Sequence, residues 1–364
     1  MRLRLRALAF TAVATTLLAA CATPPPKSPW DKGPESDSKV KACLVSDQAG
    51  FSDKSFNQSA REGLEKARVE LKVRIATTES SGPGDFKQNI DNLISQNCTI
   101  VFGVGFTLND AIRKAAEDNP DLHFVLIDSR ITQGNPPVPV NLPNAKALVF
   151  NTAEASFLAG YLAAGMSKTK KVGTWGGVQG PPIALFMDGF ADGVARYDKD
   201  RAGDRKVTLL GWNKQTQTGS FAGGFQDQSK GKQLTQGLLS QGADIIMPVA
   251  GNAGNGALAA VKATPGTAIV WVDFDGYETT SYGSIILTSV VKDVGQGVFE
   301  TIRSELSGGF DPAPYIGNLK NKGVRLAPFH DFADQVPARL KAEVAALQKG
   351  IVSGAITITT KNQP

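Results

Sequence analysis

Short apolar runs alternate with amphipathic stretches along the first half of the chain. The apolar runs are rich in Val, Ile, Leu and Phe and cover residues 41–47, 72–78, 99–105 and 123–128. Segments with helical spacing of apolar positions lie between them, at 55–71, 85–97 and 109–120. Strands that alternate with helices in this way are typical of βαβ units around a parallel sheet. The pattern therefore predicts an α/β lobe.

A second series of the same kind follows. Its predicted strands cover 171–177, 206–212, 243–251 and 268–276, with helices at 183–197, 230–242 and 254–263. The two series are linked by a helix at 154–167 that is apolar almost all round, so we expect it to be buried. A late strand at 284–291 and a helix at 293–306 have no partners unless they return to the first series.

These segments predict a two-lobed α/β protein with a cleft. We assign residues 39–150 and 283–312 to lobe 1 and residues 151–282 and 313–364 to lobe 2. The chain after residue 38 has more than 300 residues, which is large for one hydrophobic core and comfortable for two.

The N-terminus has the pattern of a signal peptide over residues 1–20. "MRLRLR" is basic, and the apolar segment after it is too short to span a bilayer. The ending "LAAC" resembles the lipobox of bacterial lipoproteins, which implies cleavage before Cys21 and a diacylglycerol on its sulfur. The alternative is a plain secretory signal with an incidental cysteine. Residues 21–38 are rich in Pro, Ser and charge, which predicts a flexible tether.

Composition excludes several functional classes. The formal charge of +5 falls to +2 when the three arginines of the predicted signal are removed, which argues against a nucleic-acid partner. The chain has only two histidines and neither C-x-x-C nor H-x-x-x-H spacing, so we expect no metal site. "GNAGNG" does not have the dinucleotide-binding spacing, and no nucleophile motif such as G-x-S-x-G occurs. We expect no cofactor and no enzymatic activity.

Polar residues follow the first predicted strand in the segment "FSDKSFNQ". Ser55 and Gln58 have the spacing of a capping box at the start of the next helix. The same segment can instead face a ligand, because ligands of open α/β sheets lie beyond the carboxyl ends of the strands. From these residues alone both roles stay open: Ser55 and Gln58 would cap the helix, while Ser52, Asp53 and Asn57 would face the cleft.

Other strand ends carry polar or aromatic residues as well. Phe106 and Lys292 come directly after predicted strands, and Gly251 and Asp273 lie in the last residues of two others. An acid and a base at such ends suit ligand hydroxyls, which both donate and accept hydrogen bonds. Each of these positions could instead be an ordinary turn or surface ion pair, but together they predict a ligand-binding edge.

Several motifs resemble the basic membrane protein (BMP/Med) family of substrate-binding lipoproteins of ABC importers. The motifs occur in the family's order along the whole chain: the lipobox, "DKSFNQSA", "VGVGFTLNDAI", "EASFLAGYLAA", "KVGTWGG", "FMDGFADGV", "GADIIMPVAGNAGNG", "VDFDG" and "ILTSVVKDV". The resemblance implies a type I periplasmic-binding-protein fold, with two Rossmann-like lobes joined by three crossovers and a ligand cleft between them. It also implies that the ligand is a nucleoside, often a purine one.

The resemblance also implies roles for single residues. Ser52 and Asp53 fall where the family places polar side chains against the base, and Asp273 and Lys292 fall where it grips the ribose. Arg61 stands where the family usually has an aromatic residue, so either its guanidinium stacks on the base or the ligand differs.

The family's sheet places the first strand between the second and the third. Cys43 and Cys98 would then sit near the same end of adjacent strands, in an oxidising compartment. We therefore expect a disulfide between them; the alternative is two buried free thiols.

The expected function is capture of a nucleoside by a monomeric, lipid-anchored protein on the extracytoplasmic face of the cell membrane, and delivery to an ABC permease. Another small polar ligand, such as a sugar or a signalling molecule, is the alternative within this class. A ligand sensor without transport is the alternative outside it.

Overall fold

The computed structural model describes residues 37–202 and 204–364, which belong to one compact unit. The predicted signal peptide, Cys21 and nearly all of the predicted tether lie outside these residues. No helix in the described ranges is long and apolar enough to cross a membrane.

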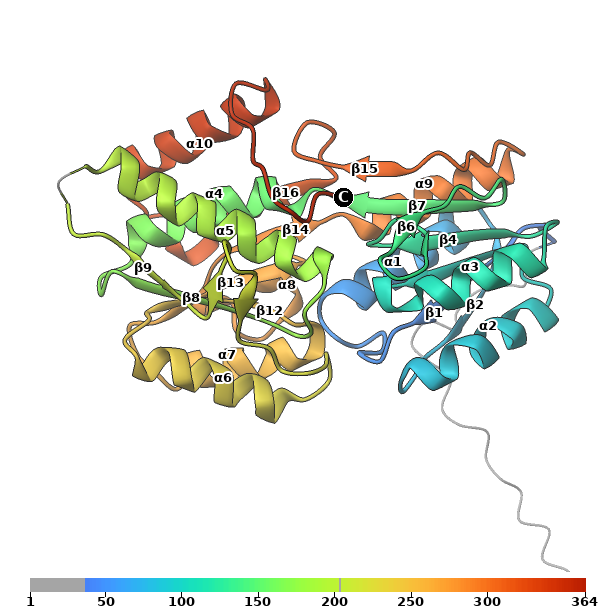
Figure 1. The fold of residues 1–364 in the computed structure, drawn as a ribbon, viewed down its shortest axis with the longest axis horizontal. Helices are drawn as coiled ribbons and strands as arrows, with labels where there is room; N and C mark the ends of the chain where they lie inside the picture. The colour runs from blue at the N-terminus through green and yellow to red at the C-terminus, as the bar shows by residue number, and fades with distance from the viewer. Residues whose placement is uncertain (1–36, 203) are drawn as a thin grey trace, which may run out of the picture. The chain divides into compact units, whose positions relative to one another are not determined.

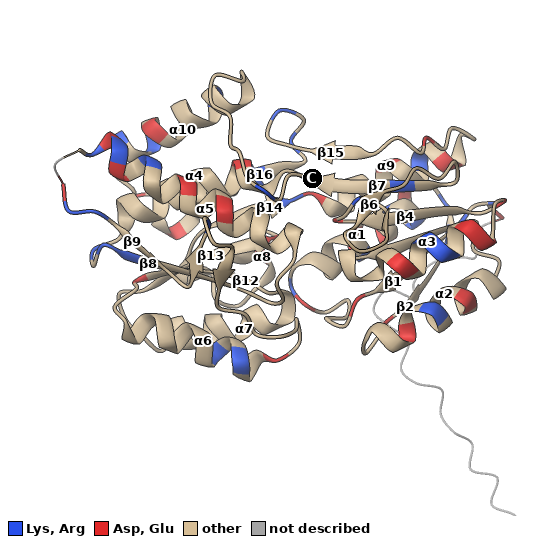
Figure 2. Ribbon diagram, in the orientation of Figure 1, with Lys and Arg blue, Asp and Glu red and all other residues tan. Residues whose placement is uncertain are grey.

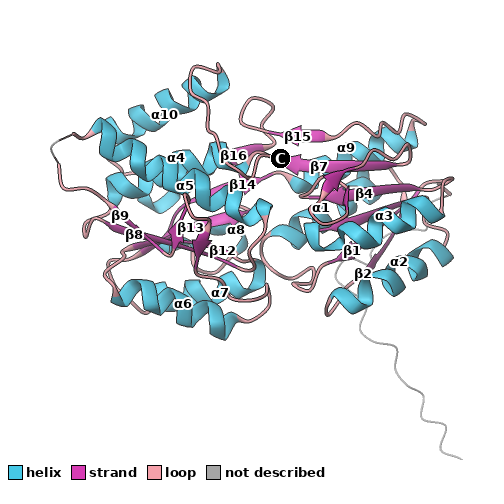
Figure 3. Ribbon diagram, viewed as in Figure 1, coloured by secondary structure: helices cyan, strands magenta, loops and turns pink. Residues whose placement is uncertain are grey.

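The first sheet has six parallel strands in the order β15-β7-β4-β3-β1-β2 (Figures 1 and 3). Its strands are β1 (Lys41–Ser46), β2 (Arg74–Thr78), β3 (Ile100–Val104), β4 (His123–Ile127), β7 (Ala145–Phe150) and β15 (Tyr315–Gly317). Its helices are α1 (Phe56–Glu70), α2 (Phe86–Ser95), α3 (Asn109–Asp118) and α9 (Val294–Leu306). Alternate residues of β1 enter different apolar clusters: Leu44 packs with Leu64 of α1, and Val45 with Ile90 of α2. Both faces of the sheet are therefore covered.

The second sheet also has six strands, in the order β16-β14-β13-β12-β8-β9. They are β8 (Lys171–Gly176), β9 (Thr208–Leu210), β12 (Ile245–Val249), β13 (Ala268–Asp273), β14 (Ile286–Lys292) and β16 (Val324–Leu326), and β16 alone runs antiparallel to its neighbour. The helices of this part are α4 (Thr152–Met166), α5 (Pro181–Asp200), α6 (Gln228–Ser240), α7 (Asn255–Lys262), α8 (Gly276–Thr279) and α10 (Ala338–Val352). Figure 2 shows acidic and basic residues along helices such as α2, α3 and α10, as expected for helices with one face in solvent.

Two small hairpins follow strands of the two sheets. They are β5 (Thr132–Gln133) with β6 (Val138–Pro139), and β10 (Trp212–Asn213) with β11 (Thr218–Gly219). The first is inserted between β4 and β7, and the second comes directly after β9. Each therefore begins near the carboxyl edge of its sheet.

The chain passes between the sheets three times, from β7 to α4, from β14 to α9 and from β15 to β16. The expected lobe boundaries at 283 and 313 do not follow this pairing. β14, expected in lobe 1, pairs with β13 of the second sheet, and β15, expected in lobe 2, pairs with β7 of the first. The apolar pattern shows that β14 is buried on both faces, but it carries no information about which sheet supplies the neighbouring strands.

Helix α9 returns to the first sheet and packs against α1. The approach is close at a pair of glycines, because a Cβ on Gly63 would lie 2.2 Å from the carbonyl oxygen of Gly295. The linking helix α4 is buried along nearly all of its length, as its apolar sequence predicted, and packs on α5. There a Cβ on Gly193 would lie 2.0 Å from the carbonyl oxygen of Phe157, so the small residues of α5 permit the contact.

The arrangement of the first three strands is confirmed. β1 pairs with β2 on one side and with β3 on the other. Cys43 of β1 and Cys98 just before β3 form a disulfide, with their Cα atoms 6.0 Å apart. Both cysteines are buried, at the end of the sheet opposite the strand ends that carry the polar residues.

Candidate ligand-binding site

The carboxyl ends of strands from both sheets surround one pocket. Its empty volume is about 430 Å³, part of which is open solvent. The residues that line it are Asp47, Ala49, Asp53, Phe56, Asn57, Gly105, Phe106, Asp128, Ile183, Phe186, Phe225, Val249, Ala250, Gly251, Asp273 and Lys292.

Parallel strands bring the charged groups of the pocket together. Asp47 and Asp128 follow β1 and β4 of the first sheet, while Asp273 and Lys292 end β13 and β14 of the second. Asp128 and Asp273 have φ angles of 72° and 68°, in the left-handed region that residues other than glycine rarely adopt. Such conformations cost energy and cluster at ligand sites, where the surrounding packing holds them.

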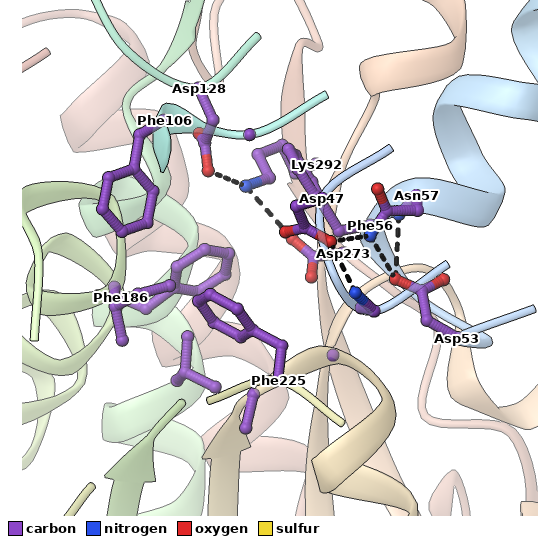
Figure 4. Close-up of a pocket in the computed structure, with 16 residues that line it drawn as sticks. Asp47, Asp53, Phe56, Asn57, Phe106, Asp128, Phe186, Phe225, Asp273 and Lys292 are labelled. Carbon is purple, nitrogen blue, oxygen red and sulfur yellow. Dashed lines mark hydrogen bonds and ion pairs between the residues drawn. The ribbon is translucent and has the colours of Figure 1, made fainter. Parts of the chain in front are cut away.

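Lys292 forms the centre of a buried ion cluster. Its Nζ lies 2.7 Å from Asp128 Oδ2 and 3.2 Å from Asp273 Oδ1 (Figure 4). Burial by itself would lower the pKa of the ammonium, but the two carboxylates together raise it above its usual value, so Lys292 stays charged. Burial raises the pKa of Asp128, although the nearby ammonium opposes this. Because Asp128 belongs to the first sheet, this pair joins the two halves of the site.

Asp47 titrates close to neutral pH. Burial raises the pKa of its carboxyl to about 7, and the carboxylates of Asp53 and Asp273 add to the effect. Its Oδ1 accepts hydrogen bonds from the Ala49 backbone N–H at 2.8 Å and from Asn57 Nδ2 at 2.9 Å. A carboxyl with such a pKa can either accept or donate a hydrogen bond through Oδ2.

Aromatic side chains form the other part of the pocket. Figure 4 shows Phe106, Phe186 and Phe225 together on one side, across from the carboxylates and the ammonium. Lys292 Nζ lies 4.4 Å from the ring centroid of Phe56 and 5.2 Å from that of Phe186, so these two rings also contact the charged part. The site is built for a molecule with a flat apolar part and a polar part rich in hydrogen-bonding groups.

The predicted capping box is wrong. Asp53, not Ser55, caps α1: its carboxylate accepts hydrogen bonds from the backbone N–H groups of Ser55, Asn57 and Gln58 at 3.0, 2.9 and 3.0 Å. A carboxylate at a helix N-terminus is a stronger acceptor than a hydroxyl and also suits the helix dipole. The Ser55 hydroxyl instead donates to Asp273 Oδ2 at 2.8 Å, in the second sheet.

Asp53 has little capacity left for a ligand. Besides the three backbone donors, Asn57 Nδ2 donates to its Oδ2 at 3.2 Å, so each carboxylate oxygen already accepts two hydrogen bonds. Burial raises the pKa of Asp53 to about 6, and these hydrogen bonds partly offset the rise. Asp53 therefore shapes the site by holding Asn57 and the start of α1.

Six of the seven predicted ligand-binding residues line the pocket: Asp53, Asn57, Phe106, Gly251, Asp273 and Lys292. Ser52 does not, because its exposed side chain lines a separate surface hollow with Lys54 and residues of α6 and α7. Arg61 also lies outside the pocket: its guanidinium is 5.5 Å from the ring of Phe51 and cannot replace a stacking aromatic residue.

Sequence reasoning missed Asp47, Asp128, Phe56, Phe186 and Phe225. The sequence could have indicated Asp47 and Asp128, because each directly follows an apolar strand, and Asp273 likewise ends one. Phe186 and Phe225 lie in a helix and a loop where no local pattern marks a pocket wall. No group of side chains suited to a metal ion occurs within residues 37–202 and 204–364.

Two α/β sheets of mainly parallel strands, three crossovers and a pocket at the facing strand ends define the type I periplasmic-binding-protein fold. Solved structures agree. An ABC transporter solute-binding protein from Aeropyrum pernix K1 superposes with a TM-score of 0.76 at 22% identity, over 88% of this chain and 93% of that one. A myo-inositol-binding protein from Caulobacter shares the fold with a TM-score of 0.59 at 13% identity, over 84% and 98%.

The chain belongs to the Bmp family, described as "ABC transporter substrate-binding protein PnrA-like", whose family model matches residues 40–361. It is 30% identical to the "ABC transporter nucleoside-binding protein BmpA" of Lactococcus lactis subsp. cremoris, over 88% of this chain and 90% of the relative. It is 28% identical to "Basic membrane protein A1" of Borrelia garinii subsp. bavariensis, over 87% and 88%.

The protein is thus a substrate-binding component of an ABC transporter and not an enzyme. This class works outside the cytoplasm, binds a small molecule and passes it to a membrane permease.

Proposed function

We propose that this protein captures a nucleoside, preferably a purine nucleoside, for an ABC importer, as a monomer held at the membrane by a lipid on Cys21. The observation that carries the proposal is the combination, in one pocket, of an aromatic side with the buried cluster of Lys292, Asp128 and Asp273. The name of the Lactococcus relative supports the same ligand class.

The two parts of the pocket match the two parts of a nucleoside. The faces of Phe186, Phe225 and Phe106 offer stacking surfaces for a base. The ribose hydroxyls each have a proton to donate and lone pairs to accept, so they can donate to Asp128 and Asp273 and accept from Lys292. Asn57 and Asp47, held together by their hydrogen bond, remain for the polar edge of the base.

The charge of the pocket favours nucleosides over nucleotides. Four carboxyl groups, those of Asp47, Asp53, Asp128 and Asp273, surround a single ammonium. A phosphate group would have to leave water and enter this surplus of negative charge, which is unfavourable in a site of low dielectric. We therefore expect a nucleoside 5′-monophosphate to bind far more weakly than the nucleoside.

A sugar or another polyol is the second candidate, because the Lys292 cluster would also hold vicinal hydroxyls. The aromatic residues distinguish the two. A sugar without a base would leave most of the surface of Phe106, Phe186 and Phe225 without a partner.

Calorimetric titration of the full-length protein in mild detergent tests the proposal. The ligands are inosine, adenosine, uridine, inosine monophosphate, ribose and myo-inositol. We expect the purine nucleosides to bind most tightly and the monophosphate and ribose to bind poorly. Lys292→Ala should weaken nucleoside binding at least tenfold, since hydrogen bonds to charged groups contribute about 1.5–3 kcal/mol.

Lys87→Ala is the matched control, because Lys87 is exposed on α2, where it pairs with Asp91. Binding of ribose or myo-inositol without any nucleoside binding would refute the proposal in favour of a sugar-binding protein. Affinity for nucleosides that is unchanged in Lys292→Ala would place the ribose elsewhere.

A further inference from the structure

A buried carboxylate without a cationic partner lies next to the aromatic part of the pocket. Asp188 is in α5, two residues after Phe186, and is fully buried. No ion pair to it is found within the described ranges. A buried carboxylate is tolerated only when its oxygens accept hydrogen bonds, so the donors around Asp188 matter for the stability of this region.

The first donors come from the β10–β11 hairpin. Trp212 Nε1 donates to Asp188 Oδ1 at 2.9 Å, and Gln217 Nε2 donates to the same oxygen at 3.0 Å. Both of these hairpin side chains therefore reach α5 at the same carboxylate.

The second donors come from the C-terminal segment that follows α10. Asn362 Nδ2 donates to Asp188 Oδ2 at 2.9 Å, and the Thr360 hydroxyl donates to the same oxygen. A second set of contacts joins the same three segments. Lys214 of the hairpin pairs with Asp192 of α5 at 2.6 Å and donates to the Thr359 carbonyl at 2.7 Å. Three segments far apart in the sequence thus meet at Asp188.

The residues that follow the hairpin include Phe225, which lines the pocket. The Trp212 ring packs edge-on against Phe221, with ring centroids 6.0 Å apart, and Phe221 bridges to Gly176 at the end of β8. The following residues lie beside the end of β8, where the Gly223 N–H donates to the Gly177 carbonyl at 2.8 Å. Phe225 comes two residues later and lines the pocket. The fit is tight, since a Cβ on Gly177 would lie 2.3 Å from the Phe225 ring.

We propose that Asp188 is a positioning residue for ligand binding, and that the C-terminal residues Thr360 and Asn362 act through it to set the spacing of Phe186 and Phe225. Phe186 is held because Asp188 lies in the same helix, and Phe225 is held because the hairpin before it is tied to the same carboxylate. A ligand ring that stacks between Phe186 and Phe225 requires a fixed distance between these two side chains. A small shift of either one therefore weakens the stacking. The proposal rests on the proposed function only for the identity of the ligand.

The double variant T360A/N362A removes the C-terminal donors and leaves every pocket residue in place. The matched control is Q363A, which alters the same segment at a side chain that donates to the carbonyl oxygen of Ile358. Backbone hydrogen exchange and the Kd for inosine are measured for both, well below the melting temperature. We expect faster exchange over residues 181–187 and 220–226, unchanged exchange in β1, β3 and β4, and a Kd for inosine raised about tenfold. The control should match the wild type in all three.

Unchanged exchange over 181–187 and 220–226 would overturn the proposal, and so would faster exchange there with an unchanged Kd. If the wild type itself does not bind inosine, the proposed function fails. Exchange alone then decides whether the C-terminal segment holds Phe186 and Phe225 in place. Uniformly faster exchange in both sheets would also overturn the proposal, because it would indicate general destabilisation.

Discussion

Replacing Lys292 by methionine should make the stability of this protein strongly dependent on pH. Methionine keeps most of the volume of the side chain but removes the charge that lies 2.7 Å from Asp128 and 3.2 Å from Asp273. Lys292 is 2% exposed and the side chains of the two acids 9%, so water cannot replace the lost partner. Two buried carboxylates would then face each other without a cation.

The expected loss is large at high pH. Breaking a buried pair by removing one partner costs about 3–5 kcal/mol, because the remaining charge is left uncompensated. Protonation relieves this cost. Burial already raises the pKa of Asp128 with Lys292 present, and without the ammonium the pKa of Asp128 must rise further.

The sign of the pH dependence follows from proton binding. A carboxyl whose pKa is higher in the folded than in the unfolded protein binds protons on folding, so the free energy of unfolding falls as pH rises. The destabilisation of Lys292→Met should therefore be largest above the raised pKa of Asp128 and should shrink as pH falls toward the ordinary carboxyl pKa.

Urea unfolding of the wild type and Lys292→Met at pH 8 and pH 5 measures this. We expect a difference of about 3–5 kcal/mol at pH 8 and a clearly smaller one at pH 5. Lys87→Met, at an exposed lysine, should leave stability at both pH values close to that of the wild type. A loss of equal size at both pH values, or no loss at pH 8, would refute the assignment of Lys292 as the charge that balances the two acids.

Three further changes have definite expected results. The raised pKa of Asp47 predicts that wild-type stability declines as pH rises from about 4 to about 7, and Asp47→Asn should flatten this decline in urea unfolding curves across that range. Cys43→Ser should lower the free energy of unfolding by roughly 4 kcal/mol in the chain-entropy model. A thiol titration of the unreduced, denatured wild type should find neither Cys43 nor Cys98 free, and two free thiols would contradict the disulfide. Cys21→Ser should move the protein from the membrane fraction to the soluble fraction, and a membrane-bound pool of unchanged size would rule out the lipid anchor.

Much of the fold could be predicted from local sequence. Apolar runs and helical periods located most strands and helices, since each depends on which face of a short segment is buried. The polar ends of the strands also indicated a binding edge, and Asp273 and Lys292 were found this way. The buried helix α4 followed from its apolar residues on every side.

Other features depended on contacts between distant residues. Ser55 has the sequence position of a cap, yet its hydroxyl bonds Asp273 and leaves the capping to Asp53. That choice depends on Asp273, which is 218 positions away and approaches only when the two sheets come together. Likewise, nothing in the segment around Phe225 predicts a pocket wall.

The amino-acid sequence alone therefore determined the series of strands and helices, the parallel sheets and the edge at which a ligand would bind. The tertiary structure decided that β14 joins the second sheet, that Asp128 pairs with Lys292, and that Phe186 and Phe225 share one pocket. The physical reason is range: periodicity records whether a residue is buried, which is a local property, whereas the partner it meets is set by the packing of segments far apart in the chain.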